Sequence, residues 1–266
     1  MRSLRVSLIQ GATRWHDAAA NRDYYGALVR ALARSTDLVV LPETFLSGFT
    51  NETLHHAETM QGAGMRWLRE LARDVDAVVT GSLIVRDRGD RCANRLIWMR
   101  PDGSHEQYDK RHLFRMAGEH ERYVGGTQRL IVELAGWRIC PLVCYDLRFP
   151  VWVRNCHDRS DERFDYDLSL FVANWPAARR HAWRTLLRAR AIENLSYCVG
   201  VNRIGTDGNG IAYAGDSAAL DFLGQPLVEF GAREQVATVT LDADALTAHR
   251  TRFPAWMDAD AFELGT

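Results

Sequence analysis

The stretch Asp37-Leu38-Val39-Val40-Leu41-Pro42-Glu43 joins a short apolar run to a proline and a carboxylate. A strand with one face in water alternates apolar and polar residues, whereas a strand that is covered on both faces forms a nearly continuous apolar run. Proline cannot donate to a sheet ladder, so Pro42 ends the strand. The run therefore predicts a buried strand of an α/β protein, with Glu43 at its carboxyl end.

Helical and strand-like patterns alternate on both sides of this run, without a composition break that would mark a linker. The predicted strands are Leu4–Gln10, Ala77–Val85, Asp167–Ala173, Tyr197–Asn202, Ser217–Asp221, Leu227–Glu229 and Gln235–Leu241. The predicted helices are Asp17–Arg34, Gly64–Asp74 and Ala178–Asn194, and the predicted hairpins span Asn94–Tyr108 and Leu130–Val143. Helical crossovers combined with hairpins favour sheets that pack on each other with helices outside. We expect one domain, 1–266, with the charged segment His157–Arg163 as a surface loop.

The composition is that of a soluble globular protein, with 47% hydrophobic and 25% charged residues among 266. The net charge of -1 gives no sign of a nucleic-acid partner, and we interpret the basic patch Arg179-Arg180-His181 as solvated surface. No apolar stretch has the length of a membrane span, and the N-terminal one is too short for a signal peptide. The five cysteines are scattered without a zinc-ligand spacing, which predicts a cytoplasmic protein with core thiols or one reactive thiol.

Lys110 is the single lysine of the chain, because thirty-two of the thirty-three formally basic residues are arginine. It lies within Tyr108-Asp109-Lys110-Arg111-His112-Leu113-Phe114. An ammonium is a compact point charge whose pKa responds to burial, whereas a guanidinium stays charged. Taken alone, this observation fits both a functional amine and a leftover residue in an arginine-biased chain.

A thiol follows another apolar strand, in Leu142-Val143-Cys144-Tyr145-Asp146-Leu147-Arg148-Phe149-Pro150. A thiol nucleophile needs a base for its proton and donors for the oxyanion that its attack creates. Glu43 offers the base and Lys110 the positive charge, so these residues and Cys144 form a chemically complete set for attack on an amide. Each of them alone has an ordinary explanation, as a core cysteine, a strand-end carboxylate or a chance lysine.

Three motifs contain these residues, in the order Pro-Glu-Thr-Phe at 42–45, Tyr-Asp-Lys-Arg-His-Leu-Phe at 108–114 and Cys-Tyr-Asp-Leu-Arg-Phe-Pro at 144–150. They resemble the signature regions of the nitrilase (carbon–nitrogen hydrolase) superfamily, and the resemblance runs from residue 4 to about residue 262. It implies a four-layer α-β-β-α sandwich that pairs with itself as a homodimer. It assigns Glu43 as general base, Lys110 as catalytic lysine, Cys144 as nucleophile and Glu119 as a second glutamate beside the lysine.

Within the superfamily, the chain is most similar to the bacterial omega-amidase branch, on the phrases Tyr108–Met116, Pro141–Arg154, Val172–Pro176, Ala189–Asn194 and Phe253–Trp256. That branch hydrolyses the terminal amide of 2-oxoglutaramate or 2-oxosuccinamate. The resemblance implies a cysteine thioester, an oxyanion held by the Tyr145 N–H and Lys110, and no metal or other cofactor. An N-carbamoyl hydrolase or a nitrilase would use the same triad, and a non-catalytic binding protein is the alternative from another class. One departure is that Cys156–Phe164 is longer than the corresponding loop.

Three further residues are candidates for the substrate pocket: Phe45, Arg148 and Trp175. Arg148 lies four residues beyond the predicted nucleophile and suits a substrate carboxylate, while an ion pair with Asp146 or Glu119 is the alternative. Together with Tyr145, Phe45 and Trp175 follow or adjoin the predicted catalytic strand ends and could form a wall of the pocket. Aromatic residues at such places either wall a pocket or belong to the core.

Overall fold

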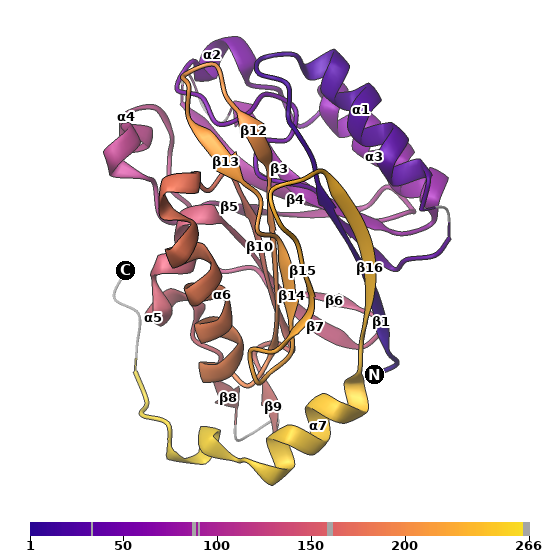
Figure 1. The fold of residues 1–266 in the computed structure, drawn as a ribbon, viewed down its shortest axis with the longest axis vertical. Helices are drawn as coiled ribbons and strands as arrows, with labels where there is room; N and C mark the ends of the chain where they lie inside the picture. Colours follow the sequence, from indigo (N-terminus) through magenta and orange to yellow (C-terminus); the bar gives the residue numbers. More distant parts are fainter. Residues whose placement is uncertain (33, 87–88, 90, 159–161, 263–266) are drawn as a thin grey trace.

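Two six-stranded sheets form the centre of the computed structural model, which describes residues 1–32, 34–86, 89, 91–158 and 162–262 (Figure 1). The first sheet has the spatial order β16 (Gln235–Leu241), β1 (Leu4–Gln10), β2 (Leu38–Val40), β3 (Val78–Arg86), β4 (Cys92–Met99) and β5 (His105–Asp109). The second has the order β15 (Pro226–Glu229), β14 (Ala218–Leu220), β11 (Tyr197–Asn202), β10 (Leu168–Ala173), β7 (Trp137–Val143) and β6 (Val132–Leu134). Pairing is parallel within β1–β2–β3 and within β7–β10–β11, and antiparallel at the other neighbours.

Both faces of β2 are covered, which is why its sequence is continuously apolar. Leu38 and Val40 belong to a core cluster that contains residues of both sheets. Val39 and Leu41 belong to a second cluster, together with Leu68 of the neighbouring helix α3 (Ala63–Val75). Successive residues of a strand point to opposite faces, so one run of apolar residues supplies two cores.

Helices cover the outer faces of both sheets. Helices α1 (Ala18–Arg30) and α3 lie side by side over the first sheet, and α6 (Arg180–Glu193) lies on the second (Figure 1). Trp67 of α3 packs in the cluster under the first sheet, whereas Trp183 and Leu187 of α6 pack in the cluster shared by the two sheets. This arrangement confirms the predicted order of layers, helix, sheet, sheet and helix.

The structure contains short elements that the sequence patterns did not predict. Their bounds are α2 (Thr53–His56), α4 (Glu119–Arg122), α5 (Pro150–Val153), α7 (Ala243–Arg252), the hairpin β12 (Ile204–Thr206) and β13 (Ala212–Ala214), and the single 3-10 turns η1 (Arg115–Ala117), η2 (Cys144–Arg148), η3 (Ala177–Arg179) and η4 (Ala255–Asp258). Helix α7 has no apolar stripe, but it has a cap: the Asp242 side chain accepts hydrogen bonds from the N–H groups of Asp244 and Ala245.

The charged segment predicted as a surface loop is partly a strand pair. His157–Asp158 (β8) pairs antiparallel with Arg163–Phe164 (β9), while residues 159–161 of the same segment lie outside the described part of the chain. Within the described ranges, no helix combines the length and the apolar character that crossing a membrane requires.

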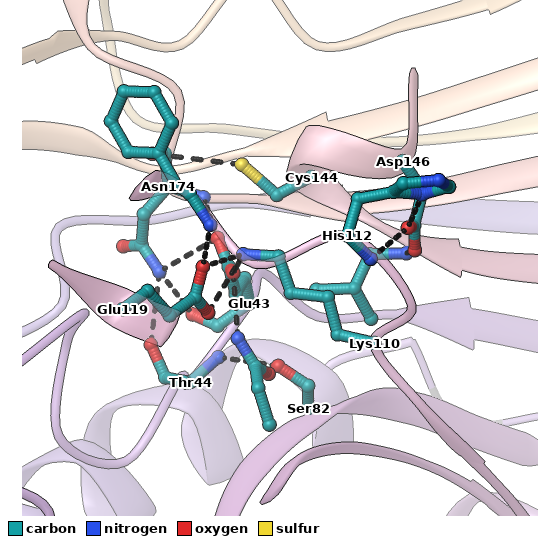
Figure 2. A network of polar contacts seen from close by, with 12 residues as sticks. Glu43, Thr44, Ser82, Lys110, His112, Glu119, Cys144, Asp146 and Asn174 are labelled. Carbon is teal, nitrogen blue, oxygen red and sulfur yellow. Dashed lines mark hydrogen bonds and ion pairs between the residues drawn. The ribbon is translucent and has the colours of Figure 1, made fainter. Parts of the chain in front are cut away.

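Strand ends deliver reactive side chains to one place between the two sheets. Strand β7 ends immediately before Cys144, β10 immediately before Asn174 and β5 immediately before Lys110, and β2 ends shortly before Glu43. Figure 2 shows these four side chains converging. The fold therefore assembles a polar cluster at the ends of strands, where α/β architectures generally place ligand sites.

Candidate active site

Glu43 is fully buried, and its carboxylate is held from several sides (Figure 2). Its Oε1 accepts hydrogen bonds from Asn94 Nδ2 at 2.8 Å and from Lys110 Nζ at 2.9 Å. Its Oε2 accepts one from the backbone N–H of Asn174 at 2.7 Å. The next residue, Thr44, has φ +41° and donates its N–H to Ser82 Oγ, which fixes the turn that carries the carboxylate. These donors leave Glu43 one orientation.

Lys110 is 1% exposed and lies between two carboxylates. Its Nζ is 2.9 Å from Glu43 Oε1 and 3.0 Å from both Oε1 and Oε2 of Glu119. Burial alone would lower the pKa of Lys110, but the Glu119 and Glu43 carboxylates raise it well above its ordinary value, so the amine stays an ammonium. The Glu119 carboxylate is itself held in place, because its Oε2 accepts a hydrogen bond from the backbone N–H of Phe114 at 2.6 Å.

Cys144 is the first residue of the turn η2 and is 8% exposed. Its backbone has φ +45°, a left-handed conformation that costs a non-glycine residue on the order of 1–3 kcal/mol and that functional sites often contain. Burial raises the pKa of the Cys144 thiol well above its usual range, and the neighbouring Glu43 carboxylate raises it further, more than the Lys110 ammonium lowers it. At rest, the sulfur is therefore a neutral thiol beside a carboxylate.

Asp146 ties the turn of Cys144 to the segment of Lys110. Its Oδ2 accepts a hydrogen bond from the Tyr108 hydroxyl at 2.8 Å, and its Oδ1 accepts one from the backbone N–H of His112 at 3.0 Å. The Nδ1 atom of His112 lies 2.8 Å from the same Oδ1. Because Tyr108 and His112 flank Lys110 in the sequence, one buried carboxylate sets the position of the thiol relative to the ammonium.

A cavity of about 590 Å³ opens over this cluster. Glu43, Lys110 and Cys144 all contribute to its wall, so the three residues that the sequence brought together as a set share one space. Further lining residues include Tyr145, Arg148 and Trp175, as predicted, and also Phe114, Asn174 and Arg179. Pockets of this size hold small organic ligands.

Phe45 is a correction to the predicted pocket. It is fully buried, does not line the cavity, and packs against Tyr25 and Trp67 with ring centroids 6.0 and 5.6 Å away. The regular alternation of side chains ends with β2, and the positive φ of Thr44 turns the chain, so Phe45 points into the core beneath the helices. Phe45 is therefore a core residue and does not form part of the pocket wall.

Two arginines reach the cavity without a carboxylate partner among the described residues. The guanidinium of Arg148 lies 4.9 Å from the ring centroid of Trp175, and that of Arg179 lies 5.5 Å from the ring centroid of Phe114. The alternative that Arg148 pairs with Asp146 or Glu119 does not hold, since the former binds Tyr108 and His112 and the latter binds Lys110. The interpretation of Arg179 as plain solvated surface was incomplete, because Arg179 lines the cavity.

The sequence patterns missed Asn94 and Asn174, the two amides that hold Glu43. Asn174 binds it twice more, through Nδ2 to the Glu43 backbone oxygen at 2.8 Å and to Glu43 Oε2 at 3.4 Å. The available signal was position: Asn174 directly follows a predicted strand, as Cys144 does. Asn94 is the first residue of a predicted hairpin strand and does not follow a strand end, so it gives no such signal.

Potential metal ligands gather at another place. His16, Glu52 and His56 each bring one ligand atom to within 4.8 Å of the others. Sequence spacing alone had offered only the neighbours His55-His56, and His55 is not part of this group.

Comparison with known proteins agrees with this geometry. The family model described as carbon-nitrogen hydrolase matches residues 5–251. The chain is 46% identical to a protein named Omega-amidase YafV from Yersinia enterocolitica, over 99% of this chain and 100% of that protein. It is 30% identical to a 2-oxoglutaramate amidase of Bacillus subtilis (strain 168), over 85% of this chain and 86% of that one.

A solved structure shows the same fold over the full length. The crystal structure of XC1258 from Xanthomonas campestris, described as a CN-hydrolase superfamily protein with an arsenic adduct in the active site, superposes with a TM-score of 0.97. The two chains are 58% identical, and the match covers 100% of each. The chain is therefore a member of the carbon–nitrogen hydrolase family, within the nitrilase superfamily.

Proposed function

We propose that this protein is an omega-amidase, which hydrolyses the terminal amide of a small keto-dicarboxylate monoamide such as 2-oxoglutaramate through a thioester on Cys144. One observation carries the proposal: a buried thiol, carboxylate and ammonium share a cavity with two arginines that lack carboxylate partners among the described residues. The names of the similar proteins, an omega-amidase and a 2-oxoglutaramate amidase, support the same reaction.

Acylation begins from the neutral thiol. Glu43 accepts the proton of Cys144 as the sulfur attacks the amide carbon, so base and nucleophile act in one step. The carbonyl oxygen becomes an oxyanion, which the Lys110 ammonium and the Tyr145 N–H stabilise. Tyr145 suits this role because it lies in the first turn of η2, where backbone N–H groups have no partner within the helix. Glu119 positions the ammonium.

Glu43 then returns the proton to the leaving nitrogen, ammonia departs, and Cys144 remains as a thioester. In the second half, Glu43 takes a proton from water as the water oxygen attacks the thioester carbon. The C–S bond then breaks, Glu43 returns the proton to the sulfur, and the free acid leaves with the thiol and the carboxylate restored. The hydrogen bonds from Asn94 and Asn174 hold the carboxylate in one place through both halves. Glu43 thus carries one proton in each half, from sulfur to nitrogen in the first and from water to sulfur in the second.

The arginines account for the choice of substrate. An amide that also carries a carboxylate needs a cation at the far end of the pocket, and a guanidinium can bind a carboxylate through two parallel hydrogen bonds. Arg148 and Arg179 enter the cavity from different elements, the first in η2 and the second in η3. Each guanidinium lies over an aromatic ring, and the attraction between the cation and the ring helps to hold the planar group in place.

Replacing either arginine with glutamine is expected to weaken substrate binding more than turnover. Loss of a hydrogen bond to a charged group costs about 1.5–3 kcal/mol, so KM for 2-oxoglutaramate should rise roughly 10- to 150-fold in Arg148→Gln or Arg179→Gln. An uncharged amide of similar size should show little change. Arg30→Gln is the matched control, because Arg30 pairs with Asp74 on the surface. Equal losses on charged and uncharged amides would argue against carboxylate binding.

The resting state of Cys144 can be tested by ultraviolet titration of thiolates. Since burial and Glu43 raise the pKa of this thiol, no Cys144-dependent thiolate signal should appear up to about pH 9, where an ordinary cysteine is more than half ionised. The signal is the difference between the protein and Cys144→Ala, in which the other four thiols cancel. A difference band with a midpoint near or below pH 8.5 would indicate a resting thiolate instead.

The function itself is tested by three substrates assayed side by side. Ammonia release from 2-oxoglutaramate should be rapid, and slower with an N-carbamoyl amino acid or an aliphatic nitrile. The reverse preference would leave the assignment to the carbon–nitrogen hydrolase family intact, but would replace the omega-amidase activity by that of an N-carbamoyl hydrolase or a nitrilase. A folded protein that turns over none of the three would favour the non-catalytic binding protein.

We also propose that the protein works in the cytoplasm as a homodimer, without a metal or other cofactor in the amide chemistry. All five cysteines are free, which suits a reducing compartment. Ile192 of α6 and Phe253 after α7 are 51% and 57% exposed, and apolar side chains at such positions suit an interface between copies. Light scattering on the purified protein tests the dimer, and a monomer at micromolar concentration would contradict it.

A further inference from the structure

Two histidines and a glutamate from separate segments meet beside the cavity. His16 lies in the loop between β1 and α1, Glu52 precedes α2, and His56 is the last residue of α2. The two imidazole ring centroids are 3.7 Å apart, with their planes tilted by 31°. One ligand atom of each of the three residues lies within 4.8 Å of the other two.

The imidazole of His16 has an unused nitrogen. Its Nε2 is buried and has no hydrogen-bond partner among the described residues. A buried polar atom without a partner is costly, and each case calls for a reason.

We propose that His16, Glu52 and His56 bind a divalent transition-metal ion of the zinc type. Two imidazole nitrogens and one carboxylate oxygen are a donor set that zinc accepts, with water in the fourth position. Bonds of about 2.0–2.2 Å in a tetrahedral site place the donor atoms about 3.3–3.6 Å apart. The donor atoms lie within 4.8 Å of one another, and metal binding would draw them to that spacing through rotation of the exposed Glu52 side chain and a wider tilt of the two rings.

Such an ion would join two loops, one of which lines the cavity. The chain from Phe49 to Glu52 contributes to the cavity wall. The two loops are already linked by a hydrogen bond from the backbone N–H of His16 to the Ser47 oxygen at 3.0 Å and by the contact between the tilted rings of His16 and His56. Glu52 belongs both to the cavity wall and to the ligand group, so a bond from its carboxylate to the metal would hold this part of the wall in place.

The test is a metal titration of tag-free protein in the Cys144→Ala background, which removes the thiol of the cavity. Cobalt(II) reports its ligands directly, because tetrahedral nitrogen and oxygen ligation gives a visible absorption band, whereas a thiolate ligand adds a charge-transfer band. Zinc(II) is then measured by calorimetry and by the rise in Tm that binding to the folded state produces. We expect one equivalent of each ion and a cobalt spectrum without the thiolate band.

Three variants decide whether these residues are the ligands. His56→Ala should weaken binding by more than about tenfold. His16→Asn should do the same while keeping the backbone, because His16 has φ +58° and asparagine tolerates that conformation. His55→Ala is the matched control, an exposed neighbour outside the group, and should bind as the parent does.

Unchanged affinity in both His56→Ala and His16→Asn would overturn the proposal, as would the absence of any binding by the parent. A thiolate band would do the same, by placing the ion on a cysteine. If His16→Asn does not fold, the comparison of His56→Ala with His55→Ala gives the same decision, because these two positions adjoin each other in α2.

Discussion

Cys144→Ala should fold normally and release no measurable ammonia from 2-oxoglutaramate. Without the sulfur, no thioester forms, and loss of a catalytic nucleophile typically lowers kcat by roughly 10⁴- to 10⁶-fold. The fold should persist because alanine is smaller, meets the same positive φ as cysteine, and leaves the hydrogen bonds of Asp146 in place. The measurement is coupled detection of ammonia at saturating substrate, with the Tm recorded alongside.

Cys156→Ala provides the matched control for a lost thiol. Cys156 is exposed, lies outside the cavity, and should be replaceable without effect on kcat. A Cys144→Ala protein that retains more than a trace of turnover would remove the nucleophile assignment, because neither Cys156 nor the buried Cys92, Cys140 and Cys198 lines the cavity.

Lys110→Arg should also be nearly inactive, although the change keeps the positive charge. The Nζ atom lies at a buried point with three carboxylate oxygens at 2.9–3.0 Å, and a planar five-donor guanidinium does not fit there. Loss of one well-placed oxyanion donor lowers kcat by about 10²- to 10³-fold, and displacement of Glu43 adds to this. The readout is kcat together with Tm, because removing a buried partner from Glu43 and Glu119 also destabilises the fold.

Arg111→Lys is the complementary control, since it makes the reverse exchange at the next position. Arg111 donates to the Gly126 oxygen and lies over the Trp152 ring, outside the cluster around Glu43. Its replacement should leave kcat within a few-fold of the parent. Near-normal kcat in Lys110→Arg would show that a diffuse cation suffices, and the oxyanion role of the lysine would have to be withdrawn.

The layers of the fold could be predicted because a strand that is buried on both faces has a continuously apolar sequence. The run from Leu38 to Leu41 serves two cores, and so it contains no polar residue. Helix α7 was harder to predict from the sequence, because its apolar residues form no stripe and only the Asp242 cap marks its start. The misplacement of Phe45 has a similar cause, since an aromatic after a strand fits core and pocket equally until the φ of Thr44 is known.

The grouping of Glu43, Lys110 and Cys144 was predictable, because each of these side chains has a distinctive chemistry. A lone lysine, a thiol and a carboxylate at strand ends form a recognisable set, and the resemblance to the nitrilase superfamily added Glu119. Contacts that support them were not predictable: Asn174 binds a carboxylate 131 residues away, and no local pattern encodes that distance. The position of Arg179 was not predictable either, because the sequence around an arginine at a helix start does not show whether the side chain faces solvent or a cavity.

The enclosure of Lys110 has a practical consequence for chemical labelling. Because the chain has no other lysine, its folded surface offers amine-directed reagents no lysine side chain. The amine is held by Glu43 and Glu119, so its acylation requires these ion pairs to break, and the rate of that reaction measures how often they do. One peptide in a mass spectrum would thus report the local stability of the active site, separately from that of the whole protein.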